Sequence, residues 1–443
     1  MTKQIHIIGG GLAGCEAAWQ VARAGGQAIL YEMRPAKQTP AHKTEWLAEL
    51  VCSNSLKTEQ ENSASRLLKD ELRRLGSLLI EIADRTRVPA GHALTVDREI
   101  FAAEVTRAIE NEPAIELRHE EVTTLSDDRT YIIASGPLTS DALASEIARI
   151  TGSERLFFYD SISPIVDSES IDTTIAFRAS RYGKSIDGTD DYLNCPFDKA
   201  EYEAFLDALL AASSAPAHIE QDNAKYFEAC FPIEEIARRG RDTLRFGPMK
   251  PMGLTDPRTG RRPWAVVQLR QENARAGSWN LVGFQNHMRF GDQCRVLRMI
   301  PGLQNAEFLR YGQVHRNTYI NAPALLDATL RLRAHPNISF AGQISGVEGY
   351  VESIATGLIA GQARAFPRET ALGSLTHYVT TADPKNYQPA NITFDLLPKL
   401  ENPPKDRKLR QSEVCRRARA ALDQHLLAGT SYRAPTVMEG TAR

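Results

Sequence analysis

The chain has 443 residues, enough for roughly two or three domains with hydrophobic cores of their own. Its 24% charged and 42% apolar residues are typical of a soluble globular protein and exclude a disordered or collagen-like chain. The 53 Lys and Arg nearly balance the 55 Asp and Glu, so the net charge of −2, taken alone, argues against a polyanionic partner such as nucleic acid.

The first 32 residues are predicted to form one β-α-β unit, with strands over residues 4–8 and 27–32 and a helix over residues 12–24. Such units have parallel strands and right-handed crossovers, so a doubly wound sheet is predicted to begin here. Leucines and an isoleucine spaced by three and four residues predict one amphipathic helix over residues 65–84. A helix over 97–110 and strands over 114–118 and 131–134 follow.

The β-α alternation lapses between about residues 160 and 323, where short apolar runs such as 264–269 and 279–284 appear. At residue 338 the first pattern returns, with a strand, a glycine-containing loop and a helix over about 350–365. We therefore predict a Rossmann-like α/β domain formed by residues 1–160 and 320–443, with a basic C-terminal extension. A smaller α/β domain, residues 161–319, is predicted to be inserted into it.

Glycines Gly9, Gly11 and Gly14 form a G-x-G-x-x-G motif directly after a predicted strand and at the start of a helix. In dinucleotide-binding folds these glycines make the tight turn, let a pyrophosphate approach the backbone, and allow close helix–strand packing. The predicted cofactor contacts in this first cradle are Gly9, Gly10, Gly11, Leu12, Ala13, Gly14 and the ribose-binding Glu32. The alternative interpretation is a structural glycine turn.

A second cradle is predicted where the strand ending at Gly342 meets Gln343 and the helix that begins at Tyr350. Gly136, after the strand over 131–134, is predicted to contact the same cofactor. Two cradles in one chain favour FAD over NAD. The alternative is one more β-α crossover with tight packing.

The six cysteines include no C-x-x-C pair, which argues against structural zinc and a disulfide framework, and no metal site is predicted. Cys52, in LVCSNSL, is predicted at a helix end, where a thiol is more reactive than a buried one. Cys230, in YFEACFPIEE, has carboxylates nearby that favour a thiol suited to carrying protons. An isolated cysteine is usually a small buried apolar residue, and the other four are interpreted so.

Net charge conceals a segregation along the chain. Residues 142–236 contain 7 Lys and Arg against 18 Asp and Glu, whereas residues 237–316 contain 15 against 5. Basic residues interleaved with Phe246, Trp264 and Trp279 can neutralise phosphates while the rings stack on unpaired RNA bases. The alternative is a solvated face that pairs with the acidic half. The basic candidates for substrate contacts are Arg238, Arg239, Arg245, Lys250, Arg261 and Arg262, and a second basic cluster occupies residues 405–419.

No signal peptide precedes the first strand, and nowhere do about 18 apolar residues run together. We therefore expect a cytoplasmic protein that does not cross a membrane.

Several long stretches together resemble the folate- and FAD-dependent tRNA (uracil-5-)-methyltransferases, the TrmFO family. They are GGGLAGCEAAW, LVCSNSL, RVPAGHALTVDRE, RFGPMKPMGLTDPRTG, MIPGLQNAEFLRYGQVHRNTYINAP and AGQISGVEGYVES. The resemblance implies an FAD-binding domain of the glutathione-reductase type. It also implies methylation of uracil C5 in the tRNA T loop, at tRNA position 54, with carbon from 5,10-methylenetetrahydrofolate and reducing power from NAD(P)H through FAD.

The resemblance places two cysteines in the chemistry, and the matching positions are Cys52 and Cys230. We predict Cys52 as the nucleophile that adds to uracil C6 and Cys230 as the proton-transfer partner, although the sequence does not decide between the two assignments. Tyr350 is predicted to stack on the flavin. The remaining substrate candidates, for folate or tRNA, are His315, Arg316 and Asn317.

Three alternatives stay open at this stage. A related flavoprotein family modifies the tRNA wobble uridine and normally needs a GTPase partner, whereas no obligate protein partner is predicted here. A flavin-containing RNA-binding protein without turnover would consume no NAD(P)H. A flavin oxidoreductase acting on a small metabolite would show no salt-dependent affinity for RNA.

Overall fold

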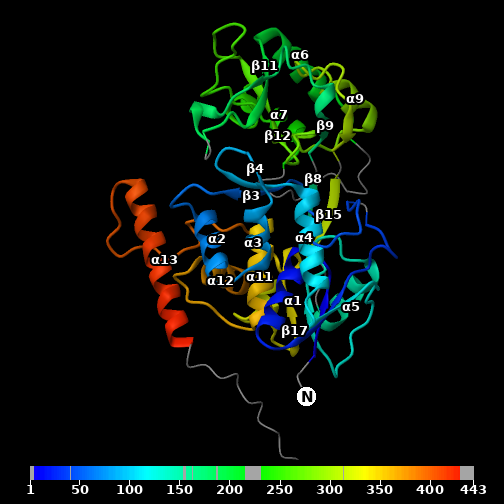
Figure 1. The fold of residues 1–443 in the computed structure, drawn as a ribbon, viewed down its shortest axis with the longest axis vertical. Coiled ribbons are helices and arrows are strands. Elements are labelled where there is room, and N and C mark those ends of the chain that lie inside the picture. Colours follow the sequence, from blue (N-terminus) through cyan, green and yellow to red (C-terminus); the bar gives the residue numbers. More distant parts are fainter. Residues whose placement is uncertain are drawn as a thin grey trace, which may run out of the picture.

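The computed structural model describes residues 4–39, 41–152, 156–161, 163–185, 188–214, 231–312 and 314–429. They form a large lobe, in the lower part of Figure 1, and a small lobe above it. One hydrophobic core contains residues from the ranges 7–147 and 319–422 and belongs to the large lobe. A second core, in the small lobe, draws on residues 166–306. That the lobes are independent domains with limits at 161 and 319 stays a prediction.

The large lobe is built on a six-stranded sheet with the order β16-β17-β7-β1-β2-β6. All neighbouring strands from β17 to β6 run parallel, and only β16 pairs antiparallel, with β17. The strands are β1 Gln4–Ile8, β2 Gln27–Tyr31, β6 Ile115–Arg118, β7 Thr130–Ile133, β16 Arg331–Leu332 and β17 His335–Phe340. The predicted doubly wound Rossmann-like sheet is confirmed.

Two helices pack closely beside this sheet, α1 (Leu12–Arg23) and α11 (Tyr350–Gln362). Their contact depends on glycines, because a Cβ added at Gly357 would lie 2.3 Å from the carbonyl oxygen of Ala13. A Cβ at Gly361 would lie 2.7 Å from the carbonyl oxygen of Ala17. Since α1 and α11 begin at the two predicted cradles, this packing brings both helix N-termini to one region.

The single helix predicted over residues 65–84 is wrong. The chain forms two helices there, α2 (Ala64–Arg74) and α3 (Leu78–Arg85). Gly76 adopts a left-handed backbone conformation with φ of 74°, and the hydroxyl of Ser77 then accepts a hydrogen bond from the Ile80 N–H to cap α3. A glycine stop and a serine cap therefore interrupt an apolar stripe that continues across both helices.

The small lobe contains an antiparallel sheet with the order β10-β11-β12-β13-β9-β14. Its strands are β9 Ile165–Asp167, β10 Phe177–Arg178, β11 Tyr192–Phe197, β12 Ala265–Gln271, β13 Ser278–Leu281 and β14 Phe308–Arg310. Helices of this lobe are α6 Lys199–Leu210, α7 Ile233–Arg238, α8 Thr243–Phe246 and α9 Phe290–Leu297. The paired strands β8 (Leu156–Ser161) and β15 (Val314–Tyr319) connect the two lobes.

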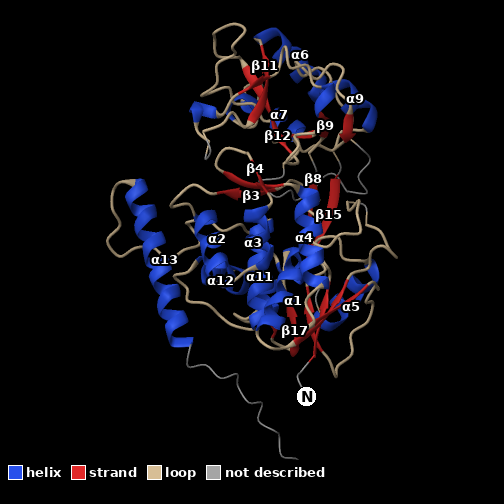
Figure 2. Cartoon of the chain, viewed as in Figure 1, coloured by secondary structure: helices blue, strands red, loops and turns tan. Residues whose placement is uncertain are grey.

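A small three-stranded sheet lies on the face of the large lobe nearest the small lobe (Figure 2). Its strands are β3 Ser55–Thr58, β4 Arg87–Val88 and β5 Ala93–Val96. The remaining helices are α4 Arg98–Glu110, α5 Asp141–Thr151, α10 Ala322–Leu325, α12 Ala371–Thr381 and α13 Arg407–Gly429. Within the described ranges, no helix has the length and apolarity needed to cross a bilayer.

Candidate functional site

An open cavity of about 1020 Å³ lies at the carboxyl ends of β1 and β7. Residues of both predicted cradles line it, together with Glu32 and Gly136. The cradle residues are Gly9, Gly10, Gly11, Leu12, Ala13, Gly342, Gln343 and Tyr350, and Gly14 does not line the cavity.

The three positions of the motif require glycine for different physical reasons. Gly9 has φ of 110°, and a Cβ there would lie 2.5 Å from the carbonyl oxygen of Ala134. A Cβ at Gly14 would lie 1.8 Å from the carbonyl oxygen of Gly9. Gly11 has no atom within 4 Å of such a Cβ and lines the cavity. Gly9 and Gly14 thus permit the fold, whereas Gly11 keeps the space before the helix N-terminus open for a ligand.

Glu32 lies where the sequence places it, beside the first cradle, but it is held by Arg34. Its two carboxylate oxygens accept hydrogen bonds from Nε and Nη2 of Arg34, at 3.0 and 3.1 Å, and Oε2 also accepts from the Gly10 N–H. Burial raises the pKa of the Glu32 carboxyl, but Arg34 outweighs this and holds the pKa below its ordinary value. Glu32 is therefore an anchored carboxylate at the edge of the cavity.

Cys52 lies in the loop between β2 and β3, so the prediction that it stands at a helix end is wrong. We call residues 50–53 the Cys52 loop. The backbone N–H groups of Cys52 and Ser53 donate to the phenol oxygen of Tyr350, at 2.8 and 3.2 Å. Because Tyr350 also lines the cavity, the Cys52 loop lies directly next to the end of the cavity formed by the second cradle.

Two arginines hold the carbonyl groups of the same loop. Nη1 and Nη2 of Arg310, in β14, donate to the carbonyl oxygens of Val51 and Cys52, both at 3.0 Å. Arg98, in α4, donates to the carbonyl oxygen of Leu50 and pairs with Glu272. The loop is therefore held by both lobes, since α4 belongs to the large lobe and β14 to the small one.

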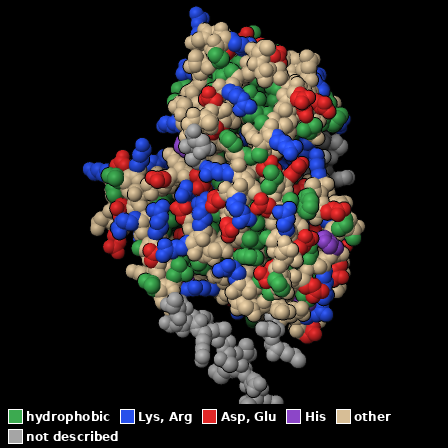
Figure 3. Space-filling view, viewed as in Figure 1, with side chains coloured by type: hydrophobic (Ala, Val, Ile, Leu, Met, Phe, Trp, Pro, Cys, Tyr) green, Lys and Arg blue, Asp and Glu red, His purple; other side chains and the backbone are tan. Residues whose placement is uncertain are grey.

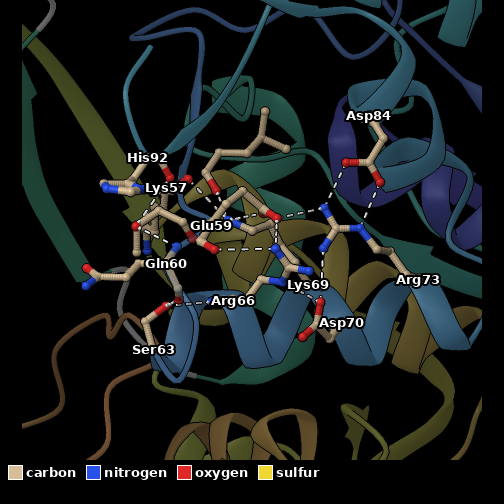
Figure 4. A network of polar contacts seen from close by, with 12 residues as sticks. Lys57, Glu59, Gln60, Ser63, Arg66, Lys69, Asp70, Arg73, Asp84 and His92 are labelled. Atoms are coloured by element: carbon tan, nitrogen blue, oxygen red, sulfur yellow. Dashed lines mark hydrogen bonds and ion pairs between the residues drawn. The ribbon is translucent and has the colours of Figure 1, made fainter. Parts of the chain in front are cut away.

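The strand that follows the Cys52 loop is fixed by a buried polar network, shown in Figure 4. Lys69 is fully buried in α2, and its ammonium donates to the carbonyl oxygens of Leu56, Lys57 and Thr58. The Lys69 ammonium also lies 3.0 Å from the carboxylate of Glu59. Lysine and glutamate thus fix the backbone of β3, immediately after the Cys52 loop.

The other described cysteines are poorly placed for thiol chemistry. Burial raises the pKa of Cys195 to about 12 and of Cys415 to about 11, and it raises the pKa of Cys15 still further. Cys294 donates to the phenol oxygen of Tyr311 at 3.1 Å. The thiol of Cys15 donates to the carbonyl oxygen of the cavity residue Gly10, but it is fully buried. Cys52 lies beside Val51 and binds Tyr350 through its backbone, and both of these residues line the cavity.

Cys230 lies outside the described residues, as do the side chains of His315, Arg316 and Asn317. The structure describes the residues that follow Cys230, beginning at residue 231. Ile233 donates its N–H to the carbonyl oxygen of Gln285 at 2.7 Å, and the next side chain, Asn286, packs against Gly312. Gly312 follows Arg310 by two residues, so a short series of contacts connects the start of α7 to the Cys52 loop.

Part of the predicted basic cluster lines an open groove of about 1720 Å³ in the small lobe. The groove contains Arg245, Lys250, Arg258, Arg261 and Arg262, with the side chain of Phe246 80% exposed. Arg238 and Arg239 lie outside it, and Arg238 pairs with Glu235. Within the described ranges, Lys250, Arg261 and Arg262 form no ion pair, whereas Arg245 pairs with Asp242 and Arg258 with Asp256.

Two aromatic residues predicted to stack on bases make other contacts in the structure. Trp279 is 1% exposed in β13, so its predicted RNA contact is wrong because the ring belongs to the core. The guanidinium of Arg245 lies 3.6 Å from the ring centre of Trp264, and the Lys199 ammonium lies 5.4 Å from it. Phe246 is therefore the exposed ring that the groove offers.

The groove and the Cys52 loop lie at opposite ends of β12. Ala265 follows Trp264 of the groove, whereas the carbonyl oxygen of Gln271 accepts a hydrogen bond from Asn54 at 3.0 Å. Six steps along a strand, at about 3.3 Å each, separate the two ends by roughly 20 Å. The sequence predicts that these basic residues and Cys52 act on the same RNA substrate, but in the structure they do not lie side by side.

The second basic cluster lies at the start of α13, where Figure 3 shows Lys and Arg side chains gathered on the surface. Lys405, Arg407 and Lys408 are exposed, whereas Arg416 and Arg419 pair with Glu413 and Asp70. Arg98, Arg310 and Asn54 were not among the predicted site residues, although each lies in one of the stretches that resemble the TrmFO family, RVPAGHALTVDRE, MIPGLQNAEFLRYGQVHRNTYINAP and LVCSNSL. In the described part of the chain, no cluster of three or more His, Cys, Asp or Glu is arranged to hold a metal ion.

The sequence matches known proteins over almost its whole length. The family model described as GIDA, glucose inhibited division protein A, matches residues 4–367. A Solibacter usitatus protein named methylenetetrahydrofolate--tRNA-(uracil-5-)-methyltransferase TrmFO is 70% identical over 96% of this chain and 99% of its own. A protein of the same name from Koribacter versatilis is 62% identical over 96% of this chain and 98% of its own.

The chain belongs to the TrmFO family. Among solved structures, GidA of Aquifex aeolicus is similar to it with a TM-score of 0.67 and 15% identity, over 100% of this chain and 80% of that one. At that identity the likeness concerns the fold alone. It agrees with the Rossmann-like sheet described above.

Proposed function

We propose that this protein methylates uracil C5 in tRNA, with 5,10-methylenetetrahydrofolate as the carbon donor and NAD(P)H as the reductant. The observation that carries the proposal is the 70% identity, over nearly the whole of both chains, to a relative named for this reaction. The position of the Cys52 loop next to a glycine-lined cavity supports it. We propose the T-loop uridine, tRNA position 54, as the target, and the cytoplasm as the location.

The residues around the cavity fit FAD. The N-terminus of α1 would hold the pyrophosphate over Gly11, where a Cβ would meet no protein atom, and Gly136, Gln343 and Tyr350 would line the remaining length. Bound FAD, once reduced by NAD(P)H, would supply the electrons that convert the transferred carbon from methylene to methyl. Stacking of Tyr350 on the flavin and contact of Glu32 with the ribose belong to the same proposal.

The thiol has a defined task in this reaction. Uracil C5 is a poor nucleophile until a group adds to C6, and a thiolate is the most nucleophilic common side chain. We assign this addition to Cys52, whose loop is held by Tyr350 and Arg310. The C5 proton must then leave through a base, a role assigned here to Cys230. The contacts from Ile233 through Asn286 to Arg310 support a meeting of the two segments.

The basic groove is proposed to bind the phosphate backbone of tRNA. Because it lies roughly 20 Å from the Cys52 end of β12, it would contact a part of the RNA other than the target uridine. Lys250, Arg261 and Arg262 supply positive charge without ion pairs in the described part of the chain. His315, Arg316 and Asn317 on β15 stay candidates for folate or RNA contacts.

The reaction can be tested with the protein alone, tRNA transcripts, NAD(P)H and methylenetetrahydrofolate carrying a labelled methylene. We expect label at C5 of the T-loop uridine without any added protein. A wobble-uridine enzyme would instead label an anticodon-loop transcript. Flavin bound to a protein that consumes no NAD(P)H would refute the enzymatic proposal and favour a non-catalytic RNA-binding protein.

Replacing both Arg261 and Arg262 with alanine is expected to weaken tRNA binding and flatten its salt dependence. Each phosphate contact contributes about 0.9 to the slope of log affinity against log salt, so we expect a change of one to two. Saturating tRNA should restore the turnover rate, since these residues lie far from Cys52. Arg241→Ala is the matched control, because Arg241 pairs with Glu203 and Asp207. An unchanged slope in the double variant would contradict the assignment.

A further inference from the structure

The side chain of Tyr182 is an exposed aromatic ring in the small lobe, in the turn that follows β10. It is 63% exposed, which is high for an aromatic residue. Its backbone adopts the left-handed conformation, with φ of 58°, which bulky residues rarely adopt. Burial does not explain this ring, and residues held in such conformations cluster at sites that bind or react.

The turn holds the ring beside the basic groove. The Tyr182 N–H donates to the carbonyl oxygen of Gly253 at 2.8 Å, and a Cβ at Gly253 would lie 2.8 Å from the ring. Glycine at position 253 therefore lets the ring lie against the backbone. The preceding residue, Met252, lines the groove, and its sulfur accepts a hydrogen bond from Arg262 at 3.0 Å. The ring is thus continuous with the wall of the groove.

Positive charge exceeds negative charge around the ring. The Lys184 ammonium lies 6.0 Å from the centre of the Tyr182 ring, and Arg181 donates to two neutral oxygen acceptors at 2.8 and 2.9 Å. Within the described ranges, neither of these cations forms an ion pair. The carboxylates of Asp190 and Asp191 lie in the same segment, and both accept backbone N–H groups.

The turn is attached to β12 midway between the groove and the Cys52 loop. Nε of Arg181 donates to the side-chain oxygen of Gln268, which lies three residues from each end of the strand. At about 3.3 Å per residue, Gln268 is roughly 10 Å from either end. Alternate residues of a strand share a face, so Arg270 lies on the same face as Gln268. Nε of Arg270 donates to Asn54, directly after the Cys52 loop, at 3.1 Å.

An unpaired nucleotide is the occupant whose chemistry fits this surface. Its base would stack on the exposed ring, and its phosphate would meet the unpaired cations beside the ring. A duplex fits less well, because its bases already stack on one another. A second copy of this chain, related by a twofold axis, would bring the same excess of positive charge against itself.

We propose that Tyr182 stacks on an unpaired base of the bound tRNA, between the phosphates held by the basic groove and the uridine at the Cys52 loop. The inference rests on the proposed function, since it names a further contact of the same substrate. It also accounts for the roughly 20 Å between the groove and the Cys52 end of β12, because the nucleotides between them gain a contact of their own.

The test measures RNA binding by the full-length, FAD-loaded protein. Tyr182→Asn removes the ring and suits the backbone, because asparagine adopts the left-handed conformation more readily than other side chains do. Urea unfolding should therefore show a protein at least as stable as the wild type. Affinity for a T-arm hairpin should fall about tenfold or more, as expected for the loss of one stacked base.

Two further measurements separate stacking from a loss of charge or fold. Affinity of Tyr182→Asn for a duplex of the T stem alone should stay unchanged, since that RNA has no unpaired loop base. The slope of log affinity against log salt should also stay unchanged, because the ring neutralises no phosphate. Tyr182→Phe should bind both RNAs as the wild type does, because stacking uses the ring and not the hydroxyl.

Phe290→Ala is the matched control. The Phe290 ring is 66% exposed, but it contacts Tyr311, which follows β14 at the opposite edge of the sheet from β10. The groove is not lined by Phe290. The affinity of this variant for the hairpin should equal that of the wild type.

Unchanged hairpin affinity in a folded Tyr182→Asn protein overturns the proposal, as does an equal loss for hairpin and duplex. Altered sedimentation with unchanged RNA affinity also overturns it and places the ring between two copies of the chain. If Tyr182→Asn fails to fold, Tyr182→Gly takes its place, and failure of both would show a structural ring. A wild type that binds the hairpin through Tyr182 but transfers no methyl group would overturn the proposed function alone.

Discussion

Cys52→Ala is expected to abolish methyl transfer, by at least about a thousandfold, while the protein stays folded and binds FAD. The reason is chemical, because without a nucleophile at C6 the uracil C5 atom cannot attack a carbon donor. The loop should keep its position, since Tyr350 and Arg310 hold it through the backbone N–H and carbonyl oxygen of Cys52, which alanine retains. Transfer of labelled carbon to tRNA, measured beside flavin absorbance, checks both halves of the expectation.

Cys294→Ala is the matched control for this variant. Cys294 is also partly buried, and its thiol donates to Tyr311 in the small lobe, away from the cavity. We expect its methyl transfer to stay within a few fold of the wild type. Full activity in Cys52→Ala would remove Cys52 from the mechanism. Equal losses in both variants would point to damage to the fold.

The part of the site predicted correctly depends on short stretches of sequence. The strand, the glycines and the helix of the first cradle are consecutive, so their pattern carries the geometry of a β-α turn. The second cradle could be predicted for the same reason, since Gly342 and Tyr350 are eight residues apart. What brings the two cradles to one cavity is the contact of Gly357 with Ala13, which no local pattern states.

The surroundings of Cys52 could not be predicted because they are assembled over long separations. Arg310 binds the Cys52 carbonyl across 258 positions, and Tyr350 binds its N–H across 298. Arg310 belongs to the basic segment 237–316 but was not among the predicted substrate contacts, and its guanidinium binds backbone carbonyls inside the protein. The break at Gly76, by contrast, was predictable, because a glycine followed by a serine is a local signal that one helix ends and another begins.

The glycines of the first cradle permit a prediction that separates folding from cofactor binding. Gly14→Ala would place a methyl group 1.8 Å from the carbonyl oxygen of Gly9. Gly9 is itself held in place, because its N–H donates to the carbonyl oxygen of Tyr31 at 2.8 Å. Helix α1 cannot move away, since α11 contacts its other side at Ala13. We therefore expect Gly14→Ala to destabilise the apoprotein by roughly 3–5 kcal/mol or to prevent folding.

Gly11→Ala is the partner variant, with the opposite expectation. Its backbone has φ of −79°, which alanine adopts readily, and no protein atom lies within 4 Å of the added methyl group. The apoprotein should unfold in urea within about 0.5 kcal/mol of the wild type. FAD affinity should instead fall about tenfold or more, because the methyl group occupies the approach of the pyrophosphate to the helix N-terminus. Urea unfolding and FAD titration of both apoproteins decide the matter: a stable Gly14→Ala protein, or a Gly11→Ala protein that binds FAD normally, would contradict this division of roles.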